Sequence, residues 1–181
     1  MTADANAFRV GGRRVVVVGA AGSGIAAAEL AARRGADVTL TEVRQTFNDA
    51  DRLAGEGVHL ELGGHRLETF ASADLIVASP GVPLEQPVFA AARARGTEII
   101  GELEFAWRFL KGRVIAITGT KGKSTTTTLI GRMLTAAGRT TLVGGNIGTP
   151  LSAQVDRSTS ETLHVVETSS FQLETTTTFH P

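Results

Sequence analysis

The chain has 181 residues, 42% hydrophobic and 20% charged, which suits one large globular domain or one small domain and part of another. Eighteen basic residues balance eighteen acidic ones, which argues against nucleic acid or an anionic membrane as a partner, and the lack of cysteine excludes disulfides, thiolate metal sites and cysteine nucleophiles. No apolar run approaches the roughly 20 residues that span a bilayer, and the start, MTADANAFRV, does not read as a secretory signal, so we expect a cytoplasmic protein.

Short aliphatic runs alternate with longer helical patterns along the chain. The runs predict strands over residues 15–18, 37–40, 75–78, 98–100, 114–118, 140–143 and 163–167. Helices are predicted over residues 24–34, 86–95, 102–110 and 123–137. The repeated strand–helix–strand order indicates an α/β architecture with parallel sheets.

Two glycine-rich strand-to-helix turns indicate two nucleotide-type units. We predict a Rossmann-like parallel-sheet domain over residues 1–108, followed over residues 109–181 by the first part of a P-loop-type ATP-binding α/β domain. The second unit supplies only three predicted strands before the sequence stops. We therefore expect the chain to be cut short.

The first turn, VGAAGSG at residues 18–24, is similar to the dinucleotide fingerprint G-x-G-x-x-G, but its glycines are spaced G-x-x-G-x-G. Ala21 stands where the second fingerprint glycine is expected, and its methyl group hinders the approach of a pyrophosphate. The start of the following helix can still hold a phosphate. Glu42 ends the next strand, where an acid commonly meets a ribose or base. A tight turn without a ligand is an equally good interpretation of this motif.

The second turn, TGTKGKS at residues 118–124, is the stronger motif, although Ile117 occupies the place of the first glycine in the common pattern G-x-x-x-x-G-K-[ST]. Its glycines allow successive N–H groups to converge on phosphate oxygens. Lys123 can reach the β- and γ-phosphates, and Ser124 can ligate Mg²⁺ with Thr125 as a neighbour. We favour a shortened phosphate loop over a serine-capped turn.

The predicted strand at residues 163–167 ends in a carboxylate, Glu167. In phosphate-loop proteins an acid at such a strand end helps to hold Mg²⁺. Taken alone, a solvated glutamate is as good an interpretation. Beside the Gly-Lys-Ser turn on a neighbouring strand, a metal ligand is the better one.

The loop at residues 118–125 resembles the ATP loop of the Mur ligases, which are ATP-dependent amino-acid ligases of peptidoglycan synthesis. Folylpolyglutamate synthases have a similar loop. Two further segments, GGNIGTP at residues 144–150 and ETSSFQLET at residues 167–175, are similar to segments of the D-glutamate-adding Mur ligases, and ASPGV at residues 78–82 is similar to their first domain. The resemblance covers nearly the whole chain.

This resemblance implies a role for each matching residue. The first domain would bind the UDP part of UDP-N-acetylmuramoyl-L-alanine through Gly22, Ser23, Glu42, Arg44 and Gly81. ATP would be held by Gly119, Thr120, Lys121, Gly122, Lys123, Ser124 and Thr125. Ser124 and Glu167 would ligate Mg²⁺, and Asn146 and Ser169 would contact the substrate. Lys123, Glu167 and Asn146 would be the catalytic residues.

The implied reaction is transfer of the ATP γ-phosphoryl group to the L-alanine carboxylate, followed by attack of the D-glutamate amine on the acyl phosphate. We expect a monomer, inactive by itself because the family's histidine and carbamylated lysine would lie beyond Pro181. The four histidines of the chain show no metal-ligand pattern, so we expect them to be structural or on the surface.

Three residues depart from the family pattern. Lys121 replaces an asparagine, Glu42 replaces an aspartate and Ala21 replaces a glycine. The alternatives are another Mur or folylpolyglutamate-type ligase, which the segment at residues 169–174 disfavours, and a non-catalytic module that binds a UDP-sugar or ATP.

Overall fold

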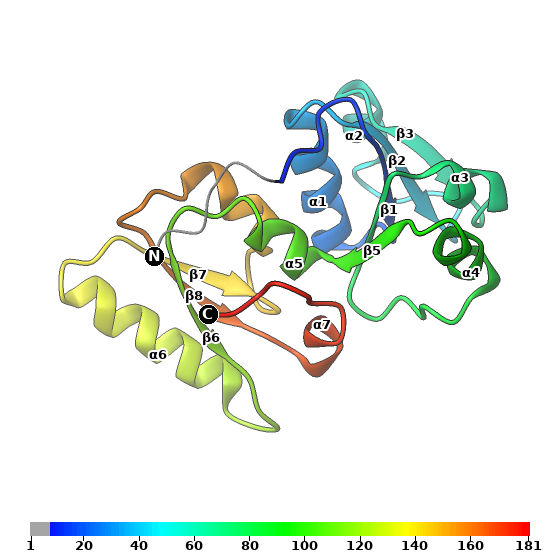
Figure 1. Cartoon of the computed structure of the whole chain (residues 1–181). Coiled ribbons are helices and arrows are strands. Elements are labelled where there is room, and N and C mark those ends of the chain that lie inside the picture. Colours follow the sequence, from blue (N-terminus) through cyan, green and yellow to red (C-terminus); the bar gives the residue numbers. More distant parts are fainter. Residues whose placement is uncertain (1–7) are drawn as a thin grey trace. The chain divides into compact units, whose positions relative to one another are not determined.

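The computed structural model describes residues 8–181, which form two compact units divided after Glu102 (Figure 1). The first seven residues, which hold most of the stretch predicted not to be a signal, lie outside the described residues. The division precedes the boundary expected at residue 108, because the helix that begins at Glu102 belongs to the second unit except for that first residue. No helix within residues 8–181 is both long enough and apolar enough to cross a bilayer.

The first unit is a parallel sheet covered by helices on both faces. Its elements are β1 (Arg14–Val18), α1 (Gly22–Arg33), β2 (Asp37–Glu42), α2 (Ala50–Gly55), β3 (His59–Leu62), α3 (Leu67–Ser72), β4 (Leu75–Ala78), α4 (Pro87–Ala94) and β5 (Glu98–Gly101). The strand order is β3-β2-β1-β4-β5, and every neighbouring pair is parallel. The predicted α/β class is therefore confirmed.

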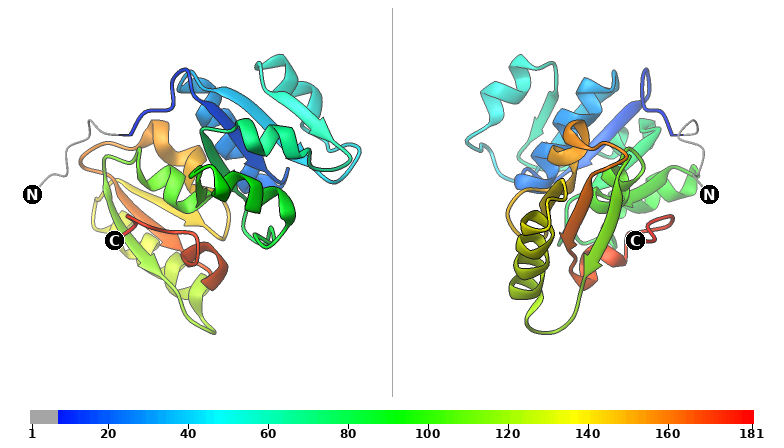
Figure 2. Two further views of the ribbon diagram at one scale, coloured as in Figure 1. Left: turned by 45° about the vertical axis from the view of Figure 1, so that its right-hand side comes forward. Right: turned by 90° about the vertical axis from the view of Figure 1, so that its left-hand side faces the viewer.

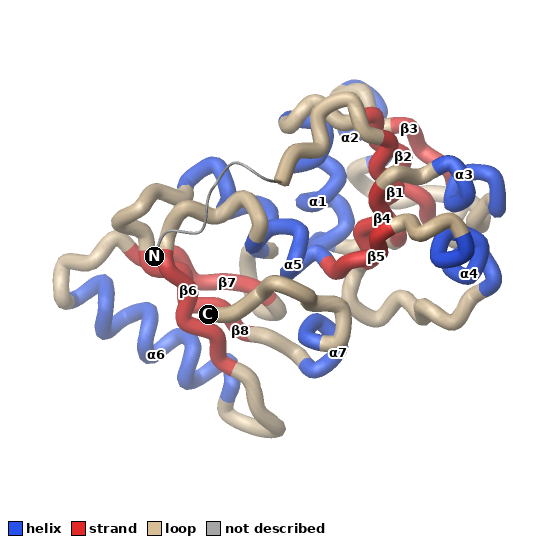
Figure 3. The backbone as a smooth tube through the Cα atoms, viewed as in Figure 1, coloured by secondary structure: helices blue, strands red, loops and turns tan. Residues whose placement is uncertain are grey.

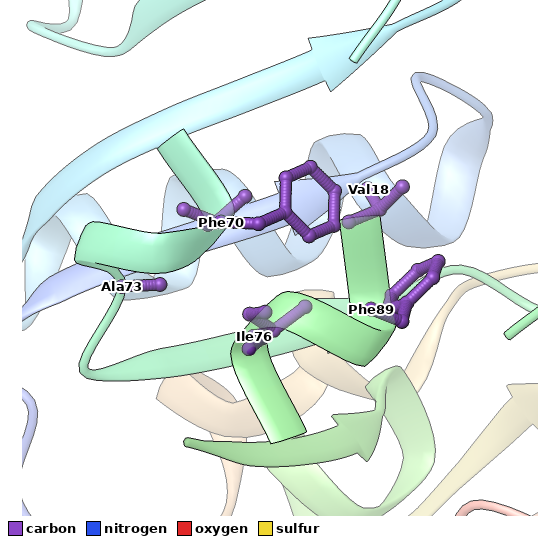
Figure 4. Packing of buried hydrophobic residues seen from close by; sticks show 7 residues of the cluster. Val18, Phe70, Ala73, Ile76 and Phe89 are labelled. Carbon is purple, nitrogen blue, oxygen red and sulfur yellow. The ribbon is translucent and has the colours of Figure 1, made fainter. Parts of the chain in front are cut away.

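The central strands are apolar because both of their faces are covered. On β1, Val16 and Val18 pack with Phe70 of α3 and Phe89 of α4 in one core cluster (Figure 4). The rings of these two phenylalanines meet edge to face, with their centroids 5.2 Å apart. The alternate β1 side chains point to the other face, where α1 lies (Figure 1). A strand buried in this way reads as a continuous run of valines.

The second unit holds a smaller sheet of the same kind. Its elements are α5 (Glu102–Trp107), β6 (Arg113–Ile117), α6 (Lys123–Ala136), β7 (Thr141–Gly145), the 3₁₀ helix η1 (Leu151–Arg157), β8 (Leu163–Glu167) and α7 (Ser170–Leu173). The strands are parallel in the order β6-β8-β7, and α6 packs along the sheet (Figure 2). Because the strands are parallel, their carboxyl ends lie at one edge, where the loops shown in Figure 3 leave the sheet.

All seven predicted strands are present, with shifts of one or two residues at their ends. The sequence analysis did not predict β3, η1 or three short helices, α2, α3 and α7. Each of these helices has six residues or fewer. Elements of this length show too few repeats of the hydrophobic pattern to stand out, and they depend on packing for their stability.

Candidate nucleotide-binding sites

The first glycine turn joins β1 to α1 and is closely packed. Gly19 has a φ of +96°, its N–H donates to the Thr41 carbonyl (2.9 Å), and its carbonyl accepts from the Ser79 hydroxyl (3.1 Å). A Cβ atom on Gly24 would lie only 1.9 Å from the Gly19 carbonyl oxygen. Gly24 therefore permits the helix to approach the turn, the function that the last fingerprint glycine has in dinucleotide-binding proteins.

Glu42 and Arg44 hold this turn from the end of β2. One Glu42 oxygen accepts from the Ala20 N–H (2.7 Å) and the other from the Arg44 N–H (3.0 Å). The Arg44 guanidinium donates to Glu42 (3.1 Å) and to the Ala20 carbonyl (3.0 Å). The side-chain hydrogen bond from Arg44, with the two N–H donors, outweighs burial and lowers the pKa of Glu42 to about 2. Both polar groups of the Ala20 backbone are thus held by one ion pair.

The start of α1 remains open to an anion. No side chain caps the helix at Ala21, and the first N–H groups of any α-helix have no partner within the helix. Gly22 and Ser23 form its first residues, and Gly81 follows β4, the strand beside β1. The chain adds β2 and β3 on one side of β1 and then β4 and β5 on the other side. The point where the strand order reverses therefore lies between β1 and β4, and ligands of open α/β sheets bind at such a point. The residues predicted to bind UDP therefore lie at this edge.

The second glycine turn joins β6 to α6 and is exposed. Gly122 adopts a left-handed conformation (φ +78°) directly before the helix, which begins at Lys123. The Lys123 ammonium folds back and donates to the Gly119 carbonyl (2.8 Å). This arrangement agrees with the predicted loop, whose strand, turn and helix are all present. In contrast to the first turn, no carboxylate within residues 8–181 accepts a hydrogen bond from a backbone N–H of this loop.

A hollow of about 420 Å³ opens beside this turn along α6. It is lined by Ser124, Thr125, Thr128, Leu129 and Arg132. The first two residues were predicted to bind the cofactor. Arg132 was not, because an arginine two turns into a helix usually indicates a solvated face.

Glu167 ends β8, the middle strand, between the ends of β6 and β7. In the sheet register it pairs with Ile117 on one side and with Gly145 on the other. Glu167 is 2% exposed, and one of its oxygens accepts from the side-chain amide of Asn146 (2.9 Å). The other oxygen is buried without a hydrogen-bond partner. A buried carboxylate oxygen in this state is poorly stabilised unless a cation or donor joins it. The structure therefore brings Asn146 and Glu167 together and leaves one acceptor available.

Ser169 follows β8 and caps the short helix α7. Its hydroxyl accepts from the Gln172 N–H (3.2 Å), and the Gln172 side chain accepts from the Ser169 N–H (3.0 Å), which is a capping box. Ser169 therefore already has a structural function at the same edge of the sheet.

His164, which was expected to be structural or on the surface, is structural, and it belongs to a buried polar network that the sequence analysis did not identify. His164 is fully buried; its Nδ1 donates to Gln154 Oε1 (3.2 Å), and its Nε2 accepts from the Ser158 hydroxyl (2.9 Å). The Ser158 oxygen accepts in turn from the N–H groups of Lys111 and Gly112. Burial lowers the pKa of His164 to about 4, so the ring is neutral at pH 7.

Within residues 8–181, no three acidic or histidine side chains gather as they would around a metal ion. A metal near Glu167 would therefore need other oxygen ligands, such as hydroxyl groups, phosphate oxygens or water. The unpartnered Glu167 oxygen fits such a ligand, and the chemistry of Ser124 also suits one.

A doubly wound parallel sheet followed by a phosphate-loop turn gives this chain the architecture of the nucleotide-binding α/β proteins. Residues 13–101 match the family model described as Mur ligase MurD-like, N-terminal domain. The resemblance to the Mur ligases found in the sequence is therefore confirmed.

Curated relatives extend this likeness through the second unit. A UDP-N-acetylmuramoylalanine–D-glutamate ligase of Acidobacterium capsulatum is 50% identical over 173 residues, which are 94% of this chain and 38% of that protein. The ligase of the same name from Anaeromyxobacter dehalogenans is 54% identical over 166 residues, 90% of this chain and 36% of that protein. The chain thus spans less than two fifths of the length of these relatives.

A solved structure shows the same fold. The pseudomurein peptide ligase type C of Methanothermus fervidus matches with a TM-score of 0.52 and 28% identity, over 86% of this chain and 33% of that one.

Proposed function

We propose that this chain supplies the UDP-substrate unit and the first part of the ATP-binding unit of a ligase that adds D-glutamate to UDP-N-acetylmuramoyl-L-alanine. The names of the relatives at 50% and 54% identity support D-glutamate over another amino acid. The observation that carries the proposal is the buried Glu167 oxygen without a partner, at the end of a strand beside the phosphate-loop strand. Because UDP-sugars and ATP are cytoplasmic metabolites, we assign the activity to the cytoplasm. We also propose that the protein acts as a monomer.

In the first unit, the substrate diphosphate would bind the open start of α1 at Gly22 and Ser23, with Gly81 beside it. Arg44 supports this assignment because its side chain is 56% exposed and retains donors beyond those that it gives to Glu42 and Ala20. Glu42 would act differently from Arg44. Both of its oxygens are engaged within the protein, so it would hold the turn and Arg44 in place.

In the second unit, the turn at residues 118–124 would receive the ATP phosphates, and Lys123 would exchange the Gly119 carbonyl for phosphate oxygens. Glu167 and Ser124 would hold Mg²⁺, which supplies charge neutralisation on the transferring phosphoryl group. Asn146 would keep the Glu167 carboxylate oriented through its 2.9 Å hydrogen bond. Ser169, which follows Glu167 and caps α7, would contact the muramoyl substrate.

The chemistry then has two steps. The carboxylate of the L-alanine residue attacks the γ-phosphorus of ATP, which forms an acyl phosphate and releases ADP. The amine of D-glutamate attacks the acyl carbon, an amide bond forms, and inorganic phosphate leaves. Donors fixed around the phosphates lower the barrier of the first step because negative charge accumulates on the transferring group.

Calorimetric titration of the 181-residue chain tests this proposal. We expect it to bind UDP-N-acetylmuramoyl-L-alanine and, separately, ATP with Mg²⁺, but not NAD. Glu167→Gln should weaken Mg²⁺-dependent ATP binding at least about tenfold, because the amide oxygen carries no charge for the cation. Glu161→Gln removes an exposed carboxylate just before the same strand and should have no effect. Binding of NAD in place of the UDP substrate, or equal effects of the two variants, would contradict the proposal.

A further inference from the structure

The most heavily hydrogen-bonded carboxylate of the second unit lies outside the predicted site. Glu104, on α5, has a side chain with no exposed surface. Its oxygens accept from the backbone N–H groups of Thr177 (3.0 Å), Thr178 (3.1 Å) and Phe179 (3.0 Å). They also accept from both threonine hydroxyls, at 3.1 and 2.6 Å, and from Arg108 (2.7 Å). We call residues 177–179 the anchor segment.

The anchor segment makes a second contact with α5. The Trp107 indole N–H donates to the Thr178 carbonyl (3.1 Å), and its ring meets the Phe179 ring edge to face at a centroid distance of 5.3 Å. Three consecutive backbone N–H groups directed at one carboxylate form an anion-binding concavity. A carboxylate on α5 is thus enclosed by chain that follows it by more than seventy residues.

Burial alone would raise the pKa of Glu104. The hydrogen bonds from Thr178, Arg108 and the backbone outweigh burial and lower it to about 2. The carboxylate therefore remains charged throughout the physiological pH range. A buried ion pair contributes little to stability compared with apolar packing, but its geometry can select one conformation of the chain.

The element that most needs such selection is α7, which lies between β8 and the anchor segment. It has four residues, far below the length at which a helix is stable by itself. Its one buried residue is Gln172, while Phe171 is 64% exposed, so apolar packing does little to fix its position. Thr175 and Thr176 bond to carbonyls of the helix, and the anchor segment follows directly.

We propose that Glu104 is a positioning residue, which holds the anchor segment and thereby fixes α7 and Ser169 for contact with the muramoyl substrate. The assignment of Ser169 to that substrate rests on the proposed function. Glu104 touches neither a strand end nor the phosphate loop, so its effect should be confined to the acceptor substrate. ATP–Mg²⁺ binding should be insensitive to it.

Thr178→Val tests the proposal because it removes the 2.6 Å hydroxyl bond to Glu104 at nearly constant volume. The matched control is Thr178→Ser, which keeps the hydroxyl group. We expect the valine variant to bind UDP-N-acetylmuramoyl-L-alanine at least about fivefold more weakly, because it loses one hydrogen bond to a charged carboxylate. Its affinity for ATP–Mg²⁺ should stay within about twofold of the wild type, and serine should restore substrate affinity.

Two further readouts do not need a ligand. Trp107 is the single tryptophan of the chain, so its fluorescence reports on the anchor contact. In the valine variant and in Glu104→Gln, we expect altered Trp107 emission and faster amide exchange in α7, with β8 unchanged. If emission changes while α7 exchange and substrate affinity do not, the positioning function is excluded. If emission stays unchanged in both variants, the anchor itself is excluded.

The same measurements separate this inference from the proposed function. A wild-type chain that binds neither UDP-N-acetylmuramoyl-L-alanine nor ATP–Mg²⁺ contradicts the proposed function. The exchange of α7 still decides whether Glu104 fixes that helix. Normal substrate binding by the wild type together with equal losses of both ligands in Thr178→Val contradicts the positioning proposal alone.

Discussion

Both glycine turns of this chain join a parallel strand to a helix, but they differ in whether an ion pair within the protein holds their backbone. In the first turn, the carboxylate of Glu42 accepts a hydrogen bond from the Ala20 N–H, and the guanidinium of Arg44 donates one to the Ala20 carbonyl. In the second, the Lys123 ammonium bonds to the Gly119 carbonyl of its own loop, and the nearby buried carboxylate, Glu167, keeps one oxygen without a partner.

This difference indicates how each turn obtains its shape. The first turn is held by an ion pair within the protein, so its conformation does not depend on a ligand. The second turn is exposed, and Glu167 at the end of the neighbouring strand keeps one oxygen without a hydrogen-bond partner, which is why we propose phosphates and a cation as ligands there. The variants below test this contrast, from the largest effect on stability to the smallest.

Alanine at the last glycine of each turn should separate close packing from backbone conformation. In Gly24→Ala the new methyl group meets backbone at 1.9 Å, so we expect the first unit to lose about 3 kcal/mol of stability or more. Gly122→Ala meets nothing within 4 Å and should lose only the strain of its positive φ, about 1–2 kcal/mol. Hydrogen exchange of peptides from β1 and from β8 measures each unit. Equal losses in the two variants would remove the contrast.

Glu42→Gln should leave the first turn without a charged carboxylate bound to its backbone, as the second turn already is. Because its partners lower the pKa of Glu42 from 4.5 to about 2, its charge contributes stability above pH 4.5 that is lost as the pH falls towards 2. We expect the variant to be less stable than the wild type by about 1–3 kcal/mol at pH 7. This difference should shrink through the same pH window. Urea unfolding monitored by β1 exchange at several pH values measures it.

The control for that experiment is Glu68→Gln, which removes an exposed carboxylate from α3 in the same unit. Its stability difference from the wild type should be small at every pH. A difference between Glu42→Gln and the wild type that persists undiminished at pH 2 would show that the charge of Glu42 does not hold the turn.

Lys123→Ala should have the smallest effect on stability and the clearest effect on binding. Its one side-chain hydrogen bond within residues 8–181 is exposed, so we expect a change in stability within about 0.5 kcal/mol. Calorimetry should show a loss of ATP–Mg²⁺ affinity of at least about tenfold, because the lysine is the mobile charge for the phosphates. Lys111→Ala, which removes an exposed lysine before β6, should bind ATP normally. A strongly destabilised Lys123→Ala would mean that the lysine supports the fold.

The sequence predicted the strands well because their signal is local. Continuous valines at β1 and an apolar run ending in Glu167 at β8 identify strands buried on both faces. The turn glycines and the Lys123–Ser124 pair are also local patterns, and the loop that they predict is present. The roles assigned to these residues in binding remain predictions.

The remaining features depend on contacts that no short segment contains. Glu104 reads as one acid in an amphipathic helix, yet three of its four partner residues follow it by 73 to 75 residues, and only Arg108 is local. His164 reads as an ordinary polar residue of a strand, and only the fold brings Gln154 and Ser158 to its ring. Glu42 was expected near a ligand, and the structure engages both of its oxygens within the protein.

The sequence alone therefore determined the class of fold, the order along the chain of seven of the eight described strands and of both glycine turns, and the resemblance to the Mur ligases, because each follows from residue type and spacing over a few positions. The tertiary structure decided which charges are already partnered and which are not. That outcome depends on which backbone groups and side chains the sheet edges bring within hydrogen-bonding distance, since a buried carboxylate takes its state from all the donors around it.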